Sequence, residues 1–192
     1  MKKNYLDFFT KSTDQLIAEN RYREFIDISR ICGQFPYAIN NKNGERIIVW
    51  CSNDYLGMGQ NEEAIAAATN ALESCGLGSG GTRNISGNNH FTVELEQEVA
   101  KLHGKEAALV FVSGYLANDT TITTLAKIIP DLVIFSDQKN HASIISGIKN
   151  SRLEKQIFRH NDMDHLEALL KEYTYETPKI IIFESVYSMD GD

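Results

Sequence analysis

Short apolar runs alternate with longer amphipathic stretches over the last two thirds of this chain. Apolar residues recur at helical spacing in residues 62–74 and 91–103, and a glycine follows each stretch. The runs at 107–112, 132–135, 156–158 and 179–183 have the length and composition of strands, and helices are expected near residues 116, 141 and 163. This alternation predicts an α/β fold with a mainly parallel sheet, flanked by helices, that gathers ligands at its carboxyl-terminal strand ends.

The first 57 residues follow a different pattern. Apolar residues between Leu6 and Ile17 recur at helical spacing, and a charged stretch follows at 21–30. Asn43 and Gly44 separate two strand-like runs, which predicts a β-hairpin closed by a two-residue type I′ turn. We therefore expect an N-terminal arm helix and β-hairpin in residues 1–57, and an incomplete large domain in residues 58–192.

Composition narrows the classes of partner. A formal net charge of -7 argues against nucleic acid or an anionic membrane as a general partner, so any anion site must be local. The N-terminus resembles neither a secretory signal nor a transit peptide, and no apolar run reaches membrane-spanning length. The three widely spaced cysteines fit reduced thiols, and the cytoplasm is the expected compartment.

A glycine-rich loop, Gly76-Leu-Gly78-Ser-Gly80-Gly81, satisfies the letters of a dinucleotide-binding motif. That motif joins a strand to a helix, whereas this loop follows a predicted helix, so we reject a dinucleotide site. A flexible connector is the ordinary alternative. The polar residues from Thr82 to Ser86 nevertheless supply more donors than a passive turn needs.

Three other candidates follow the ends of predicted strands. Ser113-Gly114-Tyr115 joins a strand to a helix, where unpaired amides favour an anion. His141 follows the run at 132–135, and a hydroxyl-rich and acidic segment, 184–192, follows the run at 179–183. A lone histidine is more often structural, and a polar turn is ordinary at a strand end. A shared sheet edge favours a ligand site.

The cluster from His160 to His165 contains imidazoles and carboxylates, which are common metal ligands. Asp162 stands where a helix N-cap belongs, and Leu166, Leu169 and Leu170 form an apolar stripe behind it. We therefore predict a capped helix and no metal site in this cluster.

Four motifs together resemble the α-oxoamine synthase family of fold-type I enzymes, which use pyridoxal 5′-phosphate (PLP). They lie at residues 52–57, 78–84, 140–143 and 184–191. The resemblance implies an aminotransferase-like fold and a homodimer with sites at the subunit interface. The runs at 21–27, 49–51 and 82–86 resemble the branch of the family that condenses glycine with succinyl-CoA to give 5-aminolevulinate, CoA and carbon dioxide.

The same resemblance implies roles for individual residues. Gly114 and Tyr115 would meet the PLP phosphate region, His141 would stack on the PLP ring, and Ser188 would lie near its phenolic oxygen. Asn53 would help to hold glycine.

Five further residues match positions that bind succinyl-CoA in this family. Arg23, Ser136 and Lys155 would bind the CoA ester, while Thr82 and Asn84 would lie near its succinyl end. Basic residues at positions 23 and 155 would give an acidic protein the local anion site that its charge requires.

The family forms its Schiff base through a lysine that would lie beyond residue 192, so we expect these residues alone to be inactive. Thr124-Leu-Ala-Lys127 matches the letters around that lysine, but it lies in a predicted helix and not before a glycine-rich turn. Lys139 is the better-placed substitute because it stands two residues from His141. Sister activities, such as glycine C-acetyltransferase or 8-amino-7-oxononanoate synthase, and a non-catalytic partner domain are the alternatives.

Overall fold

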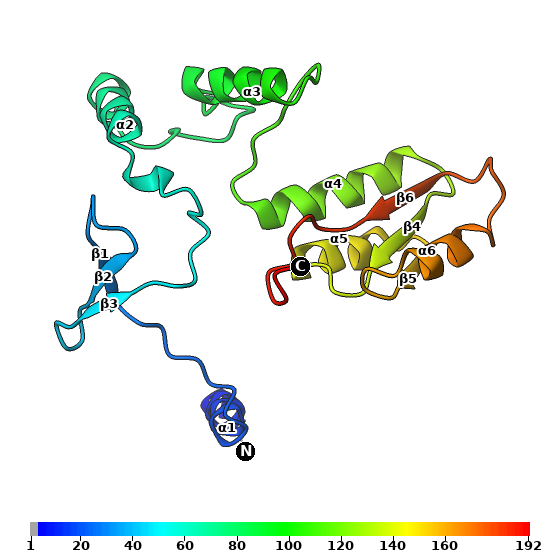
Figure 1. Cartoon of the computed structure of the whole chain (residues 1–192), viewed down its shortest axis with the longest axis horizontal. Helices are drawn as coiled ribbons and strands as arrows, with labels where there is room; N and C mark the ends of the chain where they lie inside the picture. Colours follow the sequence, from blue (N-terminus) through cyan, green and yellow to red (C-terminus); the bar gives the residue numbers. More distant parts are fainter. Residues whose placement is uncertain (1–3) are drawn as a thin grey trace. The chain divides into compact units, whose positions relative to one another are not determined.

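The computed structural model describes residues 4–192 (Figure 1). These residues divide into two compact units, Met1–Gly78 and Ser79–Asp192, and each is described by itself. Among the described residues, none of the helices combines the length and the hydropathy that crossing a membrane requires.

The first unit contains two α-helices, a short 3-10 helix and a small antiparallel sheet. Its elements are α1 (Tyr5–Ala18), β1 (Ile28–Arg30), β2 (Tyr37–Asn40), β3 (Arg46–Ile48), the 3-10 helix η1 (Met58–Gln60) and α2 (Glu62–Cys75), and the strand order is β1-β2-β3. Both helices begin where an asparagine accepts a hydrogen bond from the first turn, at Asn4 for α1 and Asn61 for α2. The predicted arm helix and the predicted helix at 62–74 are therefore confirmed.

The predicted hairpin is present, but its turn and its sheet differ from the expectation. Gly44 has a φ of 74°, whereas Asn43 is not among the residues with positive φ. A type I′ turn needs positive φ at both central residues, so the predicted turn type is wrong. The carbonyl of Asn40 instead accepts hydrogen bonds from the N–H groups of both residues. Strand β1, inside the charged stretch, was not predicted, because it is exposed along its whole length and shows no apolar alternation.

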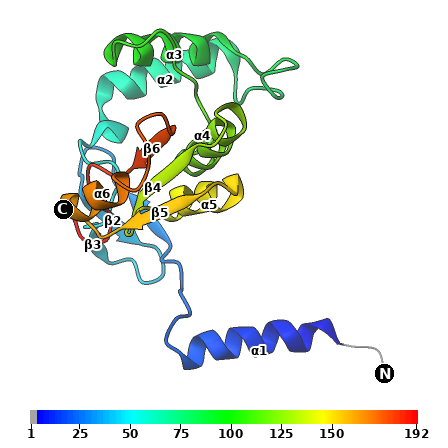
Figure 2. The ribbon, with the colours of Figure 1, turned by 90° about the vertical axis from the view of Figure 1, so that its right-hand side faces the viewer.

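The second unit is an α/β sandwich. Its elements are α3 (His90–Leu102), α4 (Gly114–Ile128), β4 (Val133–Asp137), α5 (Ala142–Ser151), β5 (Lys155–Phe158), α6 (Met163–Leu170) and β6 (Lys179–Ile182). The three strands are parallel in the order β5-β4-β6. Figure 2 shows α4 and α5 on one side of this sheet and α6 on the other. The predicted parallel sheet with helices on both faces is confirmed.

Side-chain alternation along β4 divides the core into two clusters. Ile134 packs with Ile122 of α4 and with Ile144 and Ile148 of α5. The other side of the same strand packs against β5 and α6, through Val133, Phe135, Phe158 and Leu166. Because successive strand residues point to opposite faces, one fully buried strand supports both helical layers and fixes where its carboxyl end lies.

The predicted strand at 107–112 is wrong. These residues form no regular element, and the side chains of Leu109 and Val112 are 65% and 91% exposed. Among the described residues, no strand pairs with this segment, and the Val110 N–H donates to the Glu96 carboxylate at 2.7 Å instead. An apolar run resembles a strand in sequence, but a strand also needs a neighbour for its backbone groups.

Candidate functional site

The carboxyl-terminal ends of β4, β5 and β6 lie along one edge of the parallel sheet. Strand β4 continues into α5 on one face, and β5 continues into α6 on the other. The connections therefore diverge between β4 and β5, and in open α/β sheets ligands bind where this happens. Two sets of polar side chains lie along this edge.

The first set begins at the N-terminus of α4. The Ser113 hydroxyl accepts a hydrogen bond from the N–H of Leu116 at 3.2 Å, and the Ser113 carbonyl accepts one from the N–H of Ala117. Among the described residues, the N–H groups of Gly114 and Tyr115 have no acceptor. A Cβ placed on Gly114 would meet nothing within 4 Å, so the space beside the Gly114 Cα is open. Two free amides at the positive end of a helix suit an anion such as phosphate.

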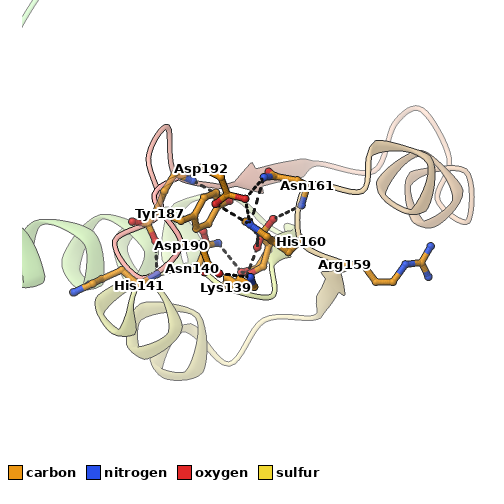
Figure 3. A network of polar contacts seen from close by, with 12 residues as sticks. Lys139, Asn140, His141, Arg159, His160, Asn161, Tyr187, Asp190 and Asp192 are labelled. Atoms are coloured by element: carbon orange, nitrogen blue, oxygen red, sulfur yellow. Dashed lines mark hydrogen bonds and ion pairs between the residues drawn. The ribbon is translucent and has the colours of Figure 1, made fainter.

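His141 lies beside this helix start. It is the N-cap of α5, and its backbone N–H donates to the Glu184 carboxylate. Its ring stands edge-on to the Tyr115 ring, with the centroids 6.5 Å apart. In Figure 3, His141 lies at one end of the polar network, and its ring points away from Asp190 and Lys139. The structure therefore brings together the imidazole, the tyrosine ring and the free amides of α4.

The segment after β6 is attached to this site through Glu184. The N–H of Glu184 donates to the Tyr187 hydroxyl at 3.3 Å, and the Tyr187 side chain is only 3% exposed. The Tyr187 ring stands edge-on to the His160 imidazole, with the centroids 4.5 Å apart. Ser188 follows directly, and its side chain is exposed on the same segment. The segment therefore connects the His141 part of the edge to the His160 part.

The second set of polar groups surrounds the buried carboxylate of Asp137. It accepts hydrogen bonds from the N–H groups of Lys139 at 2.8 Å and Asn161 at 3.1 Å, and it lies 3.0 Å from Nδ1 of His160. Nε2 of His160 lies 3.0 Å from the Asp192 carboxylate (Figure 3). Both carboxylate oxygens of Asp137 and both ring nitrogens of His160 are therefore paired.

Charge in this set is balanced by the same contacts. Burial acts to raise the pKa of Asp137, but the hydrogen bonds from Lys139, His160 and Asn161 hold that pKa below its usual value. Burial acts to lower the pKa of His160, but its hydrogen bonds to the carboxylates of Asp137 and Asp192 hold that pKa above its usual value. The set therefore favours an ionised carboxylate next to a protonated imidazole.

The cluster from His160 to His165, considered above as a metal site, is divided in the structure between two groups of contacts. Asp162 caps α6, since its carboxylate accepts from the N–H of His165 at 2.8 Å, which confirms the predicted cap. His160 instead faces Asp190 and Asp192, whose ligand atoms lie within 4.8 Å of one another and of its own. The ammonium of Lys139 lies 2.7 Å from Asp190. The protein thus supplies the positive charge that these carboxylates need.

Of two other predicted substrate residues, Ser136 is buried beside the His141 part of the edge, and Lys155 lies away from it. The Ser136 side chain is 1% exposed, and its hydroxyl accepts from the Asn140 amide at 2.9 Å. Its predicted contact with succinyl-CoA would need this hydroxyl to become accessible. Lys155 begins β5 opposite Ile134, three residues before the strand's carboxyl end, or about 10 Å away along the strand. The structure does not bring Lys155 to the edge that carries His141.

Thr82 and Asn84 lie in the glycine-rich loop, which forms a compact turn. The Thr82 carbonyl accepts hydrogen bonds from three successive N–H groups, the last of them from Gly87. A Cβ on Gly87 would lie 1.9 Å from the Gly81 carbonyl oxygen, so only glycine fits there. The side chains of Thr82 and Asn84 are exposed on this turn.

An ion pair ties this loop to α3. Arg83 binds the Glu96 carboxylate through both terminal nitrogens. These hydrogen bonds, with a further one from the Val110 N–H, lower the pKa of Glu96 to about 2. Arg83 is therefore already paired with Glu96 and is not a free donor in this loop.

Arg23 and Asn53 belong to the first unit. Both have exposed side chains and lie in segments without regular secondary structure. Their predicted contacts with succinyl-CoA and glycine stay predictions.

The sequence did not predict Asn118 or the supporting contacts of Asn140 and Ser143, two residues of the motif at 140–143. Asn118 of α4 donates to the Ser143 hydroxyl of α5 at 2.9 Å, and Asn140 donates to the Ile182 carbonyl at 2.7 Å. Asn118 stands three residues after Tyr115, on the same side of a helix, and this spacing was a usable signal. The contact between Asn140 and β6 joins residues 42 positions apart and left no local signal.

The chain resembles known proteins over nearly its whole length. The 5-aminolevulinate synthase of Rickettsia prowazekii is 54% identical over 187 residues, which cover 97% of this chain and 45% of that protein. The 5-aminolevulinate synthase of Bradyrhizobium diazoefficiens is 52% identical over 191 residues, which cover 98% of this chain and 47% of that protein. The chain therefore spans less than half the length of these relatives.

A solved structure gives the same picture of the fold. A serine palmitoyltransferase from S. paucimobilis, with bound PLP and myriocin, matches with a TM-score of 0.79 at 31% identity, over 98% of this chain and 48% of that one. This likeness confirms the predicted aminotransferase-like fold. Residues 45–192 also match the family model described as aminotransferase class I and II. The chain belongs to the aminotransferase class I and II family.

Proposed function

We propose that this chain is part of a 5-aminolevulinate synthase, which condenses glycine with succinyl-CoA to give 5-aminolevulinate, CoA and carbon dioxide. This reaction would place the protein at the start of haem biosynthesis, in the cytoplasm and as a homodimer. The observation that carries the proposal is the meeting of His141, Tyr115 and the free amides of α4 at one sheet edge. Identity above 50% to two synthases supports the choice of reaction.

The residues at this edge fit PLP as the cofactor. The N–H groups of Gly114 and Tyr115 would hold the phosphate, because two unpaired donors at a helix N-terminus match a dianion. His141 would stack on the ring, and Ser188 would hydrogen-bond near the phenolic oxygen. When bound, PLP supplies the electron sink that a glycine-derived carbanion needs.

The protein's own groups would orient this chemistry. Glu184 accepts the backbone N–H of His141 and so fixes the start of α5, from which the imidazole projects. Lys139 is poorly suited to replace the missing Schiff-base lysine, because its ammonium is paired with Asp190, which raises the pKa of Lys139. Lys127 is an exposed residue in the last turn of α4. The reactive lysine is therefore expected outside these residues.

Substrate binding is proposed for the remaining predicted residues. Asn53 would help to hold glycine, Arg23, Ser136 and Lys155 would bind succinyl-CoA, and Thr82 and Asn84 would lie near its succinyl end. The proposed organisation is an N-terminal arm and hairpin in residues 1–57 and part of the large PLP domain in residues 58–192.

A chimera tests the function directly. The 192 residues would replace the matching 45% of the Rickettsia prowazekii synthase, and aminolevulinate formation would be measured with glycine and succinyl-CoA. We expect turnover by the chimera and its loss in the matched His141→Ala chimera. A correctly folded chimera that binds PLP but forms no aminolevulinate would contradict the proposal. Competition between succinyl-CoA and acetyl-CoA in the same assay would distinguish a sister activity.

The 192 residues alone provide the second arm of the test. Mixed with PLP, glycine and succinyl-CoA, they should form no aminolevulinate above a control without protein. Turnover by this chain alone would refute the expectation that the Schiff-base lysine lies outside it.

A further inference from the structure

Helices α4 and α5 cross at a close contact that positions the neighbours of His141. A Cβ on Gly147 of α5 would lie 3.1 Å from the Asp119 Cα and 3.0 Å from Cδ1 of Ile122, both on α4. Any larger residue would push the helices apart. The contact therefore allows Asn118, next to Asp119, to reach across to α5.

The group that Asn118 reaches is the buried hydroxyl of Ser143. Ser143 is 0% exposed, and its Oγ lies 2.9 Å from Nδ2 of Asn118 and 2.8 Å from Nδ1 of His141. The side-chain amide nitrogen of Asn118 can only donate, so Ser143 Oγ accepts there. The hydroxyl hydrogen of Ser143 is then free to point at Nδ1 of His141.

A backbone hydrogen bond independently indicates that Nδ1 of His141 is an acceptor. The N–H of Ser143 also donates to Nδ1 of His141, at 3.2 Å. A backbone N–H cannot accept, so Nδ1 must carry a lone pair and no hydrogen for this contact to form. The neutral imidazole therefore carries its hydrogen on Nε2.

We propose that Asn118 and Ser143 are positioning residues that hold His141 with Nδ1 turned inward as a double acceptor and with its hydrogen on Nε2. The link from this pose to PLP stacking rests on the proposed function, whereas the pose itself does not. Fixing the tautomer and the ring by a second residue is a common way to orient an imidazole.

Nitrogen NMR on the ¹⁵N-labelled chain tests the proposal, with a His141→Gln chain to assign the ring. At about pH 8, the neutral form of this ring should show the Nε2–H tautomer. The decisive variant is Asn118→Asp. Its carboxylate accepts a hydrogen bond from the Ser143 hydroxyl, which then no longer donates to Nδ1 of His141. Losing one hydrogen bond should shift the tautomer ratio toward Nδ1–H by roughly fivefold.

Asn150→Asp is the matched control. Asn150 joins the same two helices, since its amide donates to Asp119 at 2.8 Å, but it contacts neither Ser143 nor His141. This control removes a different hydrogen bond between the same helices, so it should leave the His141 tautomer ratio almost unchanged. Ser143→Ala, which deletes only the hydroxyl, should shift the ratio in the same direction as Asn118→Asp.

The proposal is overturned if His141 shows Nδ1–H in the original chain. It is equally overturned if Asn118→Asp changes the ratio no more than Asn150→Asp does, because the Asn118 amide would then not be the donor. These outcomes are separate from the proposed function. A chimera that fails to bind PLP would contradict the proposed synthase function, but it would not affect the inference about the His141 tautomer.

Discussion

The two polar sets on the carboxyl edge of the β5-β4-β6 sheet differ in whether their donors are used. Around Asp137, backbone amides, an imidazole and a carboxylate satisfy one another within a buried centre. Around His141, the first two amides of α4 have no acceptor among the described residues. A buried set whose groups are all paired stabilises a fold, whereas an open set with unused donors can bind a ligand.

The difference between the two sets shows that titratable groups with shifted pKa values do not by themselves mark a ligand site. Two of the shifted groups on this edge, Asp137 and His160, form the centre of the satisfied set. Structural ion-pair networks also shift pKa values, so such a shift alone does not identify a ligand site. Unpaired backbone donors are the better guide on this edge.

The largest expected effect comes from breaking the satisfied set. Asp137→Ala leaves two N–H groups and the His160 imidazole without their acceptor in a buried position. We expect the free energy of unfolding to fall by roughly 3 kcal/mol, measured by urea denaturation with an unchanged m-value. Asp164→Ala, an exposed acid in the first turn of α6, is the control and should cost less than about 1 kcal/mol. Equal losses in both variants would contradict the comparison.

The pH dependence of the satisfied set should be a smaller effect. The raised pKa of His160 gives stability that is complete below about pH 6.5 and is lost as pH rises through the folded pKa. The lowered pKa of Asp137 gives stability that is present above about pH 3.9 and is lost as pH falls through the folded pKa. Protection of the Gly191 N–H, which donates to the Tyr187 carbonyl, should therefore be greatest between these limits once exchange is corrected for its intrinsic rate.

The loss of Gly191 protection at high pH depends on the imidazole of His160. In a His160→Gln chain, the loss of Gly191 protection at high pH should disappear, after correction for the intrinsic exchange rate. The acid side, set by Asp137, should remain. An unchanged alkaline side would mean that His160 does not hold the segment after β6.

The open set should respond in binding and not in stability. Gly114→Pro removes one free N–H at the first helical position, where proline is tolerated and where the preceding Ser113 already has extended φ and ψ of -159° and 156°. PLP affinity of the chimera should fall by roughly tenfold, because a charge-assisted hydrogen bond is lost. Gly114→Ala keeps the N–H and adds a Cβ that meets no protein atom within 4 Å, so its affinity should fall much less than that of Gly114→Pro. Equal weakening in both variants would show that bulk, not the donor, matters.

The sequence predicted local features of the fold better than long-range ones. Helix starts at Asn61 and Asp162 were correct because the capping side chain and the helix are neighbours in sequence. Strand β1 was missed and the run at 107–112 was wrongly predicted as a strand, because pairing depends on partners that local composition does not reveal.

The same limit applies to the site. His141 and Gly114 were predicted as candidates because each follows an expected strand, even though only the strand before His141 forms a ladder. The partners that orient His141, namely Glu184 and the Asn118–Ser143 pair, come from three separate elements and needed the structure.

A PLP titration of the ¹⁵N-labelled chain, followed by amide chemical shifts, tests the contrast between the two sets most directly. We expect the largest shifts at Gly114, Tyr115 and His141, while the amides of Lys139 and Asn161, which donate to Asp137, should stay almost unmoved. Largest shifts at Lys139 and Asn161, with Gly114 and Tyr115 unchanged, would contradict this expectation.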